Sequence, residues 1–190
     1  MAQVALAALD DANPLPPWES PTSSGRVIAL DVVLPDVVVD AVYRIARHAA
    51  TLTESWYRAQ LDRGLDAYAY VEMVGVVAAV AAVDGFYRAV GLPRPPLPAP
   101  TAGEPHRRHP EIESAALNFV PVAVPADQVA AVVQGLSAVP AEWDNVCQLA
   151  AAQYIPVNEM GELSWSRGTL SRAEIELVAA RLSIARECFY

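Results

Sequence analysis

The chain has 190 residues, enough to bury a sizeable core as one domain or as two small halves. Its 13 Lys and Arg against 22 Asp and Glu give a formal net charge of −9, which excludes the basic surface that nucleic acid or an anionic membrane requires. Hydrophobic residues make up 54% of the chain and aromatic residues only 7%, so the apolar side chains are mostly small and suit closely packed helices.

The cysteines and the start of the chain predict a cytoplasmic protein. Cys147 and Cys188 lie far apart in the sequence and do not make a disulfide framework, which fits a reducing compartment. The first residues, Met1 to Val4, lack the positive charge of a signal peptide. We expect Cys147 to be a small buried side chain rather than a reactive thiol.

Residues 1–35 are predicted to form an irregular N-terminal arm. Prolines cluster between residues 14 and 17, and a second run, residues 20–25, combines Ser, Pro, Thr and Gly, which favours turns and extended chain. Val and Ile in residues 26–34 favour a short strand or an extended segment there.

The first helical half spans residues 36–92 and is predicted to contain three helices. Each begins at or directly after a residue whose side chain can accept a backbone N–H hydrogen bond, and the last two end at glycine. The predicted helices are 36–50, 54–63 and 67–90, with Asp36, Thr53 and Asp66 as N-caps and with Gly64 and Gly91 as stops.

The third of these helices is the most apolar part of the chain. Its uncharged run, Met73 to Val83, is too short to cross a bilayer, which needs about 20 apolar residues, so a buried helix is expected. Gly75 and Gly85, together with several alanines, give a surface that another helix can approach closely.

Residues 93–110 are predicted to be a linker. Five prolines between residues 93 and 100 make its first part stiff and extended. His106 and His109 follow between two further prolines, which favour a loop, and no cysteine or acidic cluster joins them. We therefore expect no metal site and no cofactor.

The second helical half, residues 111–190, is predicted to contain helices at 125–135, 140–154 and from Ser171 onward. Ser171 and Glu174 form the pattern of a capping box at the start of the last helix. The stripe expected to be buried along that helix consists of Ile175, Val178, Ala179 and Leu182.

Two parts of the chain carry a resemblance to a known family. The first is the last helix with Glu187-Cys188-Phe189-Tyr190 after it, and the second consists of Leu52–Trp56, Gly64-Leu65, Tyr70–Val77 and Phe86–Pro93 in the first half. Both parts resemble the AhpD-like alkylhydroperoxidase / carboxymuconolactone decarboxylase superfamily, in whose thiol motif Glu precedes Cys-x-x-Cys, often with Tyr before the second Cys. The resemblance implies an all-α, AhpD-like helical bundle of two related halves over residues 36–190, with the last helix truncated.

The resemblance also implies a chemistry and its residues. One thiolate of the family's motif attacks a peroxide, becomes a sulfenic acid and is resolved by its neighbour as a disulfide. Carried over, Glu176 is the relay carboxylate, Cys188 the resolving thiol and Tyr190 the relay tyrosine. Twelve residues separate Glu176 from Cys188, about 120° from eclipsed on a helix of about 3.6 residues per turn, so a bend or a neighbouring helix must bring them together.

The motif places its second Cys at residue 191, and the relay His beyond it. A stop at this point is expected if codon 191 is UGA and encodes selenocysteine, whose selenol is ionised at neutral pH. A frameshift, a true truncation or a degenerate paralogue would also end the chain at this point.

Three classes of function remain open. They are a thiol or selenothiol peroxidase, a carboxymuconolactone-decarboxylase-like enzyme and a non-catalytic helical oligomerisation module. The peroxidase would use a small hydroperoxide and a thiol reductant, whereas the decarboxylase has no need of Cys188. We also expect a homo-oligomer, because helices rich in Ala, Val and Gly bury best against other helices, and a truncated last helix would expose apolar surface.

Overall fold

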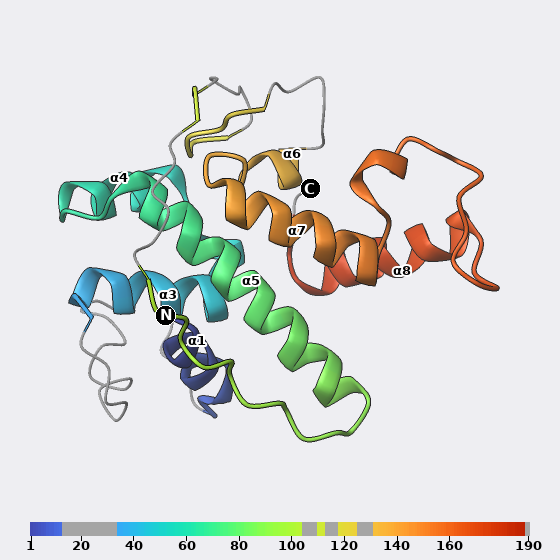
Figure 1. Cartoon of the computed structure of the whole chain (residues 1–190), viewed down its shortest axis with the longest axis horizontal. Helices are drawn as coiled ribbons and strands as arrows, with labels where there is room; N and C mark the ends of the chain where they lie inside the picture. The colour runs from blue at the N-terminus through green and yellow to red at the C-terminus, as the bar shows by residue number, and fades with distance from the viewer. Residues whose placement is uncertain (13–33, 104–109, 113–117, 125–130, 189–190) are drawn as a thin grey trace.

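The computed structural model describes residues 1–12, 34–103, 110–112, 118–124 and 131–188, and this part of the chain is all-α (Figure 1). An isolated antiparallel β-bridge joins Arg167 to Leu170. The elements are α1 (Ala2–Asp10), α3 (Asp36–His48), η1 (Ala49–Thr51), α4 (Glu54–Asp62), α5 (Ala67–Ala89), α6 (Ala131–Gln134), α7 (Pro140–Gln153), η2 (Val157–Glu159) and α8 (Arg172–Ala185).

The hydrophobic core forms where α1, α3 and α5 contact one another. α5 runs through the middle of the molecule, with α1 and α3 on one side and α7 on the other (Figure 1). Val4 and Ala5 of α1, Val42 of α3 and Met73 of α5 are almost completely buried. The long apolar helix therefore does what its composition predicts and serves as the central element of the fold.

The N-terminal arm is not irregular throughout, because α1 occupies its first residues. Val4, Ala5 and Ala8 lie on one face of α1 and are inaccessible to solvent. The prolines that predict an irregular arm begin only at Pro14, whereas residues 2–10 contain four alanines and no helix breaker. Residues 26–33, most of the expected extended segment, lie outside the described part of the chain.

The helices of the first half and most of their caps are confirmed. The Thr53 hydroxyl accepts the Trp56 N–H at 3.2 Å, and the Asp66 carboxylate accepts the N–H groups of Tyr68 and Ala69 at 3.0 and 2.9 Å. Asp36 differs slightly, since it is the first residue of α3 and Pro35 is the N-cap.

Both predicted glycine stops have the left-handed backbone that favours glycine. Gly64 follows α4 with φ of +93°, and Gly91 follows α5 with φ of +70°. Glycine carries no Cβ, so it adopts this conformation without the steric penalty that other residues meet. The sequence therefore located the ends of α4 and α5 correctly.

Four aromatic rings join α4 and α5 to the segment around Phe119. The Tyr57 ring lies 4.9 Å from that of Tyr70 and 5.3 Å from that of Phe119, and Trp56 lies 6.1 Å from Tyr70, measured between centroids. Burial raises the pKa of the Tyr70 phenol to about 12. These rings pack against one another in the interior and at its edge.

α7 crosses α5 at Gly75. A Cβ built on Gly75 would collide with the carboxylate of Glu142, which lies in the first turn of α7. Gly85 has nothing within 4 Å of such a Cβ, so only Gly75 serves the close helix approach that was predicted for both.

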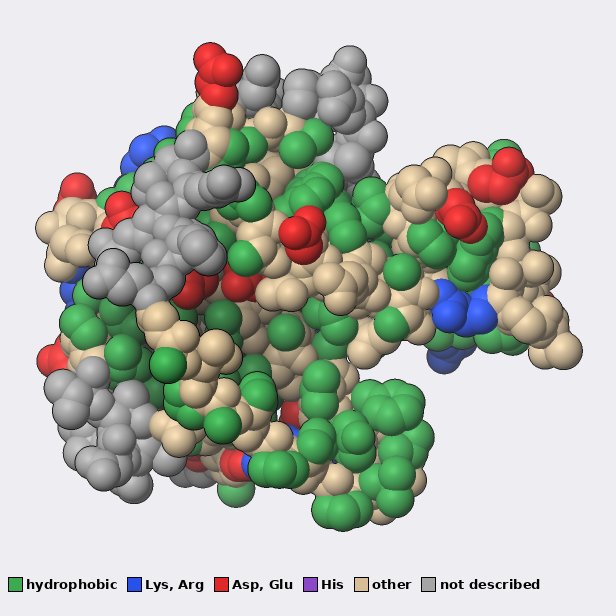
Figure 2. Space-filling model, in the orientation of Figure 1, with side chains coloured by type: hydrophobic (Ala, Val, Ile, Leu, Met, Phe, Trp, Pro, Cys, Tyr) green, Lys and Arg blue, Asp and Glu red, His purple; other side chains and the backbone are tan. Residues whose placement is uncertain are grey.

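α5 is the one described helix that is long and apolar enough, by length and composition, to cross a bilayer. The count from sequence gave a shorter stretch because it stopped at Glu72 and Asp84. Core helices of globular proteins meet the same criterion, and α5 contacts α1, α3 and α7. Its second half is more open, and apolar side chains gather in the lower right lobe of the surface, where α5 ends and the proline-rich segment follows (Figure 2).

α8 begins as predicted but packs on a different side. Ser171 and Glu174 form the capping box, and Ile175 is 8% exposed. The prediction of a buried stripe is wrong for two other residues, because Val178 is 66% and Leu182 is 60% exposed. The periodic pattern identifies an apolar stripe correctly, but the ion pair and hydrogen bonds of its polar edge determine which side of α8 meets the protein.

Candidate functional site

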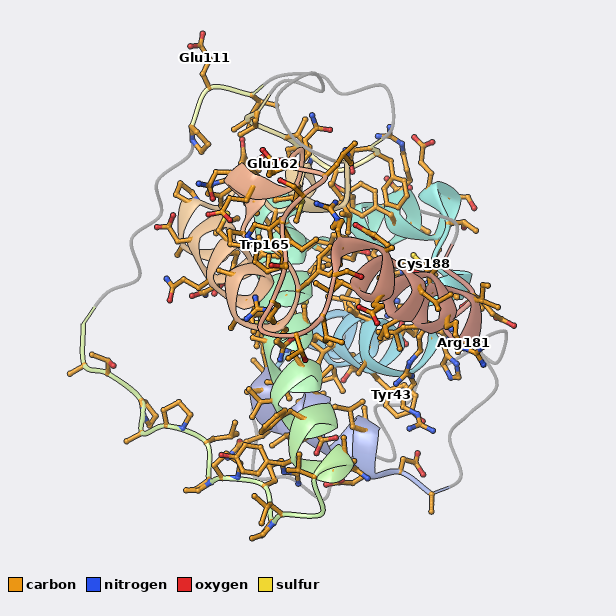
Figure 3. All side chains as sticks on the ribbon, turned by 90° about the vertical axis from the view of Figure 1, so that its right-hand side faces the viewer. Tyr43, Glu111, Glu162, Trp165, Arg181 and Cys188 are labelled. Carbon is orange, nitrogen blue, oxygen red and sulfur yellow. The ribbon has the colours of Figure 1, made fainter. Side chains whose placement is uncertain are left out.

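The three candidate site residues lie at different points of the C-terminal segment. Glu176 is in the second turn of α8, whereas Cys188 follows the end of that helix. Figure 3 labels Cys188, which follows α8, and Arg181, which lies on α8. Tyr190 lies outside the described residues, as do His106 and His109 of the linker.

Cys188 follows a tight turn that ends α8. The Cys188 N–H donates to the Ser183 carbonyl at 2.9 Å, and the Glu187 N–H donates to the Ile184 carbonyl at 3.2 Å. Glu187 has φ of +54°, the left-handed conformation. This pattern is a Schellman motif, usually made with glycine at the position of Glu187. The helix therefore stops before Cys188, and the exposed Cys188 is not on a face of α8.

Glu176 is held as an oriented carboxylate. The Tyr154 hydroxyl donates to its Oε2 at 2.6 Å, and Arg172 Nε donates to its Oε1 at 2.7 Å. The hydrogen bond from Tyr154 lowers the pKa of Glu176, and Arg172 lowers it further. Burial, with the same carboxylate beside it, raises the pKa of the Tyr154 phenol. Glu176 is thus ionised and its partner phenol protonated at neutral pH.

The structure does not bring Glu176 and Cys188 together within one chain. Ala185 lies nine positions after Glu176 on the helix, a rise of about 14 Å at about 1.5 Å per residue. The turn after Ala185 supplies the bend that the sequence required, but it lies at the far end of α8 from Glu176. A proton relay between the two residues would need groups other than these two.

Two arginines that the sequence analysis did not single out build the surroundings of Glu176. Arg172 also donates to the carbonyls of Met160 and Glu162, at 2.9 and 3.0 Å. Arg167 donates to the Tyr154 carbonyl at 3.0 Å. Arg172 was recognisable, because Arg and Glu four residues apart on a helix commonly pair, whereas the approach of Tyr154 from α7 was not.

The other described cysteine and histidine, Cys147 and His48, lie in helices of the fold. Cys147 is half-buried on α7, and desolvation, followed by the charge of Asp144, raises the pKa of its thiol. A thiol with a raised pKa is a poor nucleophile at neutral pH, which agrees with the expected packing role. His48 ends α3, with its ring 6.3 Å from that of Tyr43.

Within the described part of the chain, no group of three or more His, Cys, Asp or Glu side chains is arranged to hold a metal ion. No protein-family model matches this chain. No curated protein sequence and no solved structure matches it either. The structure shows the all-α class, and the AhpD-like arrangement stays a prediction from the sequence resemblance.

Proposed function

We propose that this chain acts in thiol or selenothiol peroxidase chemistry of the AhpD-like type, with Cys188 as the resolving thiol. The single observation that carries the proposal is the exposed Cys188 in the turn directly after α8. A resolving thiol must reach a sulfenic or selenenic acid on a nearby residue, so it needs an accessible position.

The proposed reaction consumes one hydroperoxide molecule per catalytic turnover. A chalcogenolate attacks the peroxide oxygen, the O–O bond breaks, and the alcohol leaves with a proton. The Cys188 thiolate then attacks the oxidised chalcogen, water leaves, and a disulfide or selenenylsulfide remains until a thiol reductant returns two electrons. Protein groups carry all of these steps, so the proposal requires no cofactor or metal. The reducing conditions of a cytoplasm suit it.

The resemblance places the attacking chalcogen at residue 191, next to Tyr190, and Glu176 and Tyr190 in the proton relay. Glu176 fits a relay role in one respect, since its carboxylate is ionised and oriented by Tyr154 and Arg172. Because the 190 residues contain Cys188 without its vicinal partner, we expect peroxide consumption by this chain near background.

The test begins with the codon that follows Tyr190 in the gene. UGA or a Cys codon, followed in frame by a His codon, is the expected result. The protein extended accordingly, with Cys at residue 191, should consume hydroperoxide with a dithiol reductant and lose turnover on Cys188→Ser. Cys147→Ser is the matched control and should retain turnover. Turnover that survives Cys188→Ser, or a UAA or UAG codon, would overturn the proposal.

A further inference from the structure

The polar edge of α8 faces the protein and its apolar side faces solvent. Arg172 and Glu176 are bonded to the preceding loop and to Tyr154, and they fix the orientation of the helix. Leu177 is 62% exposed and Ile184 is 78% exposed on the other side. Removing large apolar side chains from water is favourable, so this arrangement favours a further partner.

The exposed residues form one continuous stripe. Glu174, Leu177, Val178, Arg181 and Ile184 follow the spacing of i, i+3, i+4, i+7 and i+10, so they share one side of α8, called here the outer face. All five are exposed. Among the described helices, none packs along α8 in the way that α7 packs along α5.

We propose that the outer face of α8 pairs in antiparallel orientation with the outer face of α8 in a second copy of this chain. A two-fold axis between Leu177 and Val178 makes the stripe self-complementary. Glu174 lies three residues before Leu177, and Arg181 lies three residues after Val178. Each Glu174 therefore faces the partner's Arg181, and the apolar pairs lie between the two ion pairs.

The charges favour this orientation over the alternative. A parallel pair would place Glu174 against its own copy, and Arg181 likewise, so like charges would repel. Glu174 uses Oε2 in the capping box with Ser171, and the ion pair would use Oε1. No described carboxylate of the same chain lies within ion-pair distance of Arg181.

The apolar contact extends beyond the helix at both ends. Leu170 precedes the capping box and is 46% exposed. In the same register it lies opposite the partner's Ala185, next to the partner's Ile184, so one leucine covers each end of the paired stripe. This pairing uses no thiol and is independent of the peroxidase proposal.

The first measurement is the mass of the 190-residue chain by light scattering after size exclusion, at about 100 µM, well above a micromolar Kd. We expect twice the 20.3 kDa of one chain. Leu177→Arg should give a monomer. Ala180→Arg, exposed on α8 but off the stripe, is the matched control and should remain dimeric. A monomeric native chain, or a dimer unaffected by Leu177→Arg, would overturn the proposal, and far-UV circular dichroism checks that both variants fold.

Two further variants test the register. Arg181→Glu alone, and Glu174→Arg alone, should each weaken the dimer about tenfold or more, because each creates two like-charge pairs. An equimolar mixture of the two variants should recover a dimer, since all cross-chain pairs are then of opposite charge. Arg181→Glu would leave a parallel dimer unchanged, and that result would contradict the antiparallel arrangement.

Oxidative cross-linking gives an independent measure of the same geometry. In a Cys188→Ser background, Leu177→Cys lies beside the two-fold axis and should form a disulfide between chains. Native Cys188 should not, because antiparallel pairing separates the two copies of Cys188 by more than the length of α8. A disulfide through Cys188 in the native dimer, without one at residue 177, would show that another surface pairs.

Discussion

The core of α1, α3 and α5 and the C-terminal segment of residues 157–188 use similar sequence patterns with opposite results. In the core, apolar faces meet one another, and Val4, Ala5 and Val42 are wholly buried. In the C-terminal segment, Ile175 is the one apolar residue of α8 that is buried. The contrast teaches that an amphipathic pattern identifies an apolar stripe, while neighbouring elements decide whether that stripe faces inward.

The largest expected difference between the two regions is in the stability of their apolar contacts. Met73→Ala removes a side chain that is 1% exposed, so the free energy of unfolding should fall by about 2–5 kcal/mol. Leu163→Ala, in the C-terminal segment, changes a side chain that is 81% exposed. It should change the free energy of unfolding by less than about 0.5 kcal/mol. Urea unfolding measures both, and equal losses would contradict the comparison.

The second prediction concerns the ion pairs at the edge of the core. Asp84, with a side chain 7% exposed, accepts hydrogen bonds from Arg88 Nε at 2.6 Å and Arg94 at 2.8 Å. Asp84→Ala leaves these arginines without their buried partner and should lower the free energy of unfolding by about 1.5–3 kcal/mol.

The control for that variant is Asp10→Ala, in the same network. The Asp10 side chain is 46% exposed, so its loss should lower the free energy of unfolding by no more than about 1 kcal/mol. A hydrogen bond from Arg94 lowers the pKa of Asp10, so its contribution is present above the unfolded pKa of about 3.9 and is lost as pH falls through the folded value. An Asp10 effect larger than that of Asp84 would contradict the assigned burial.

The third prediction tests the contact between α5 and α7. Gly75→Ala places a Cβ against the Glu142 carboxylate and should destabilise the fold by about 1–3 kcal/mol. Gly85→Ala, on the same helix with open space around it, should stabilise the fold by about 0.4–1 kcal/mol. Adding Glu142→Ala to Gly75→Ala should recover part of the loss. Thermal unfolding of the three variants decides, and equal effects of the two alanines would contradict the crossing.

The fourth prediction is a pH dependence at the same crossing. Desolvation raises the pKa of Glu142, the charge of Glu72 raises it further, and a hydrogen bond from Asn145 opposes both. A carboxyl with a raised folded pKa contributes stability below its unfolded value of about 4.3, and this is lost as pH rises through the folded pKa.

Glu142→Gln removes this titration. The variant should match the native protein near pH 4 and exceed it in Tm at pH 7. Because the other carboxyl groups titrate in both proteins, the difference between the two Tm curves isolates Glu142. A difference that is independent of pH would contradict the desolvation argument.

The smallest expected effect is at the end of α8. Residue 187 has a left-handed backbone, which favours glycine, so Glu187→Gly should raise the free energy of unfolding by about 1 kcal/mol. Hydrogen exchange at the Cys188 and Glu187 amides, which close the turn, should slow. Faster exchange in the variant would contradict the turn.

Much of the helical order could be predicted from local chemistry. Thr53, Asp66 and Ser171 cap helices through their own side chains, and Gly64 and Gly91 terminate helices through their own backbones. These interactions join residues a few positions apart, so sequence contains them fully. α1 was missed because the prolines after it gave the stronger local signal.

The candidate site was less accessible to sequence. The sequence proposed Glu176 and Cys188, and Arg172 lies four residues from Glu176, but nothing local places the Tyr154 hydroxyl on that carboxylate. The turn before Cys188 could not be predicted either, because glutamate, unlike glycine, does not favour the left-handed conformation that Glu187 adopts.

The sequence by itself determined an all-α chain, most of its cap residues and its apolar stripes. The tertiary structure decided which stripe meets which neighbour: Gly75 receives α7 and Gly85 receives nothing, and α8 turns Leu177 and Ile184 to solvent. The physical reason is the sequence distance over which each interaction acts. Helix capping and helix periodicity involve residues a few positions apart, whereas packing and hydrogen bonds such as that of Tyr154 join elements that are distant in the chain.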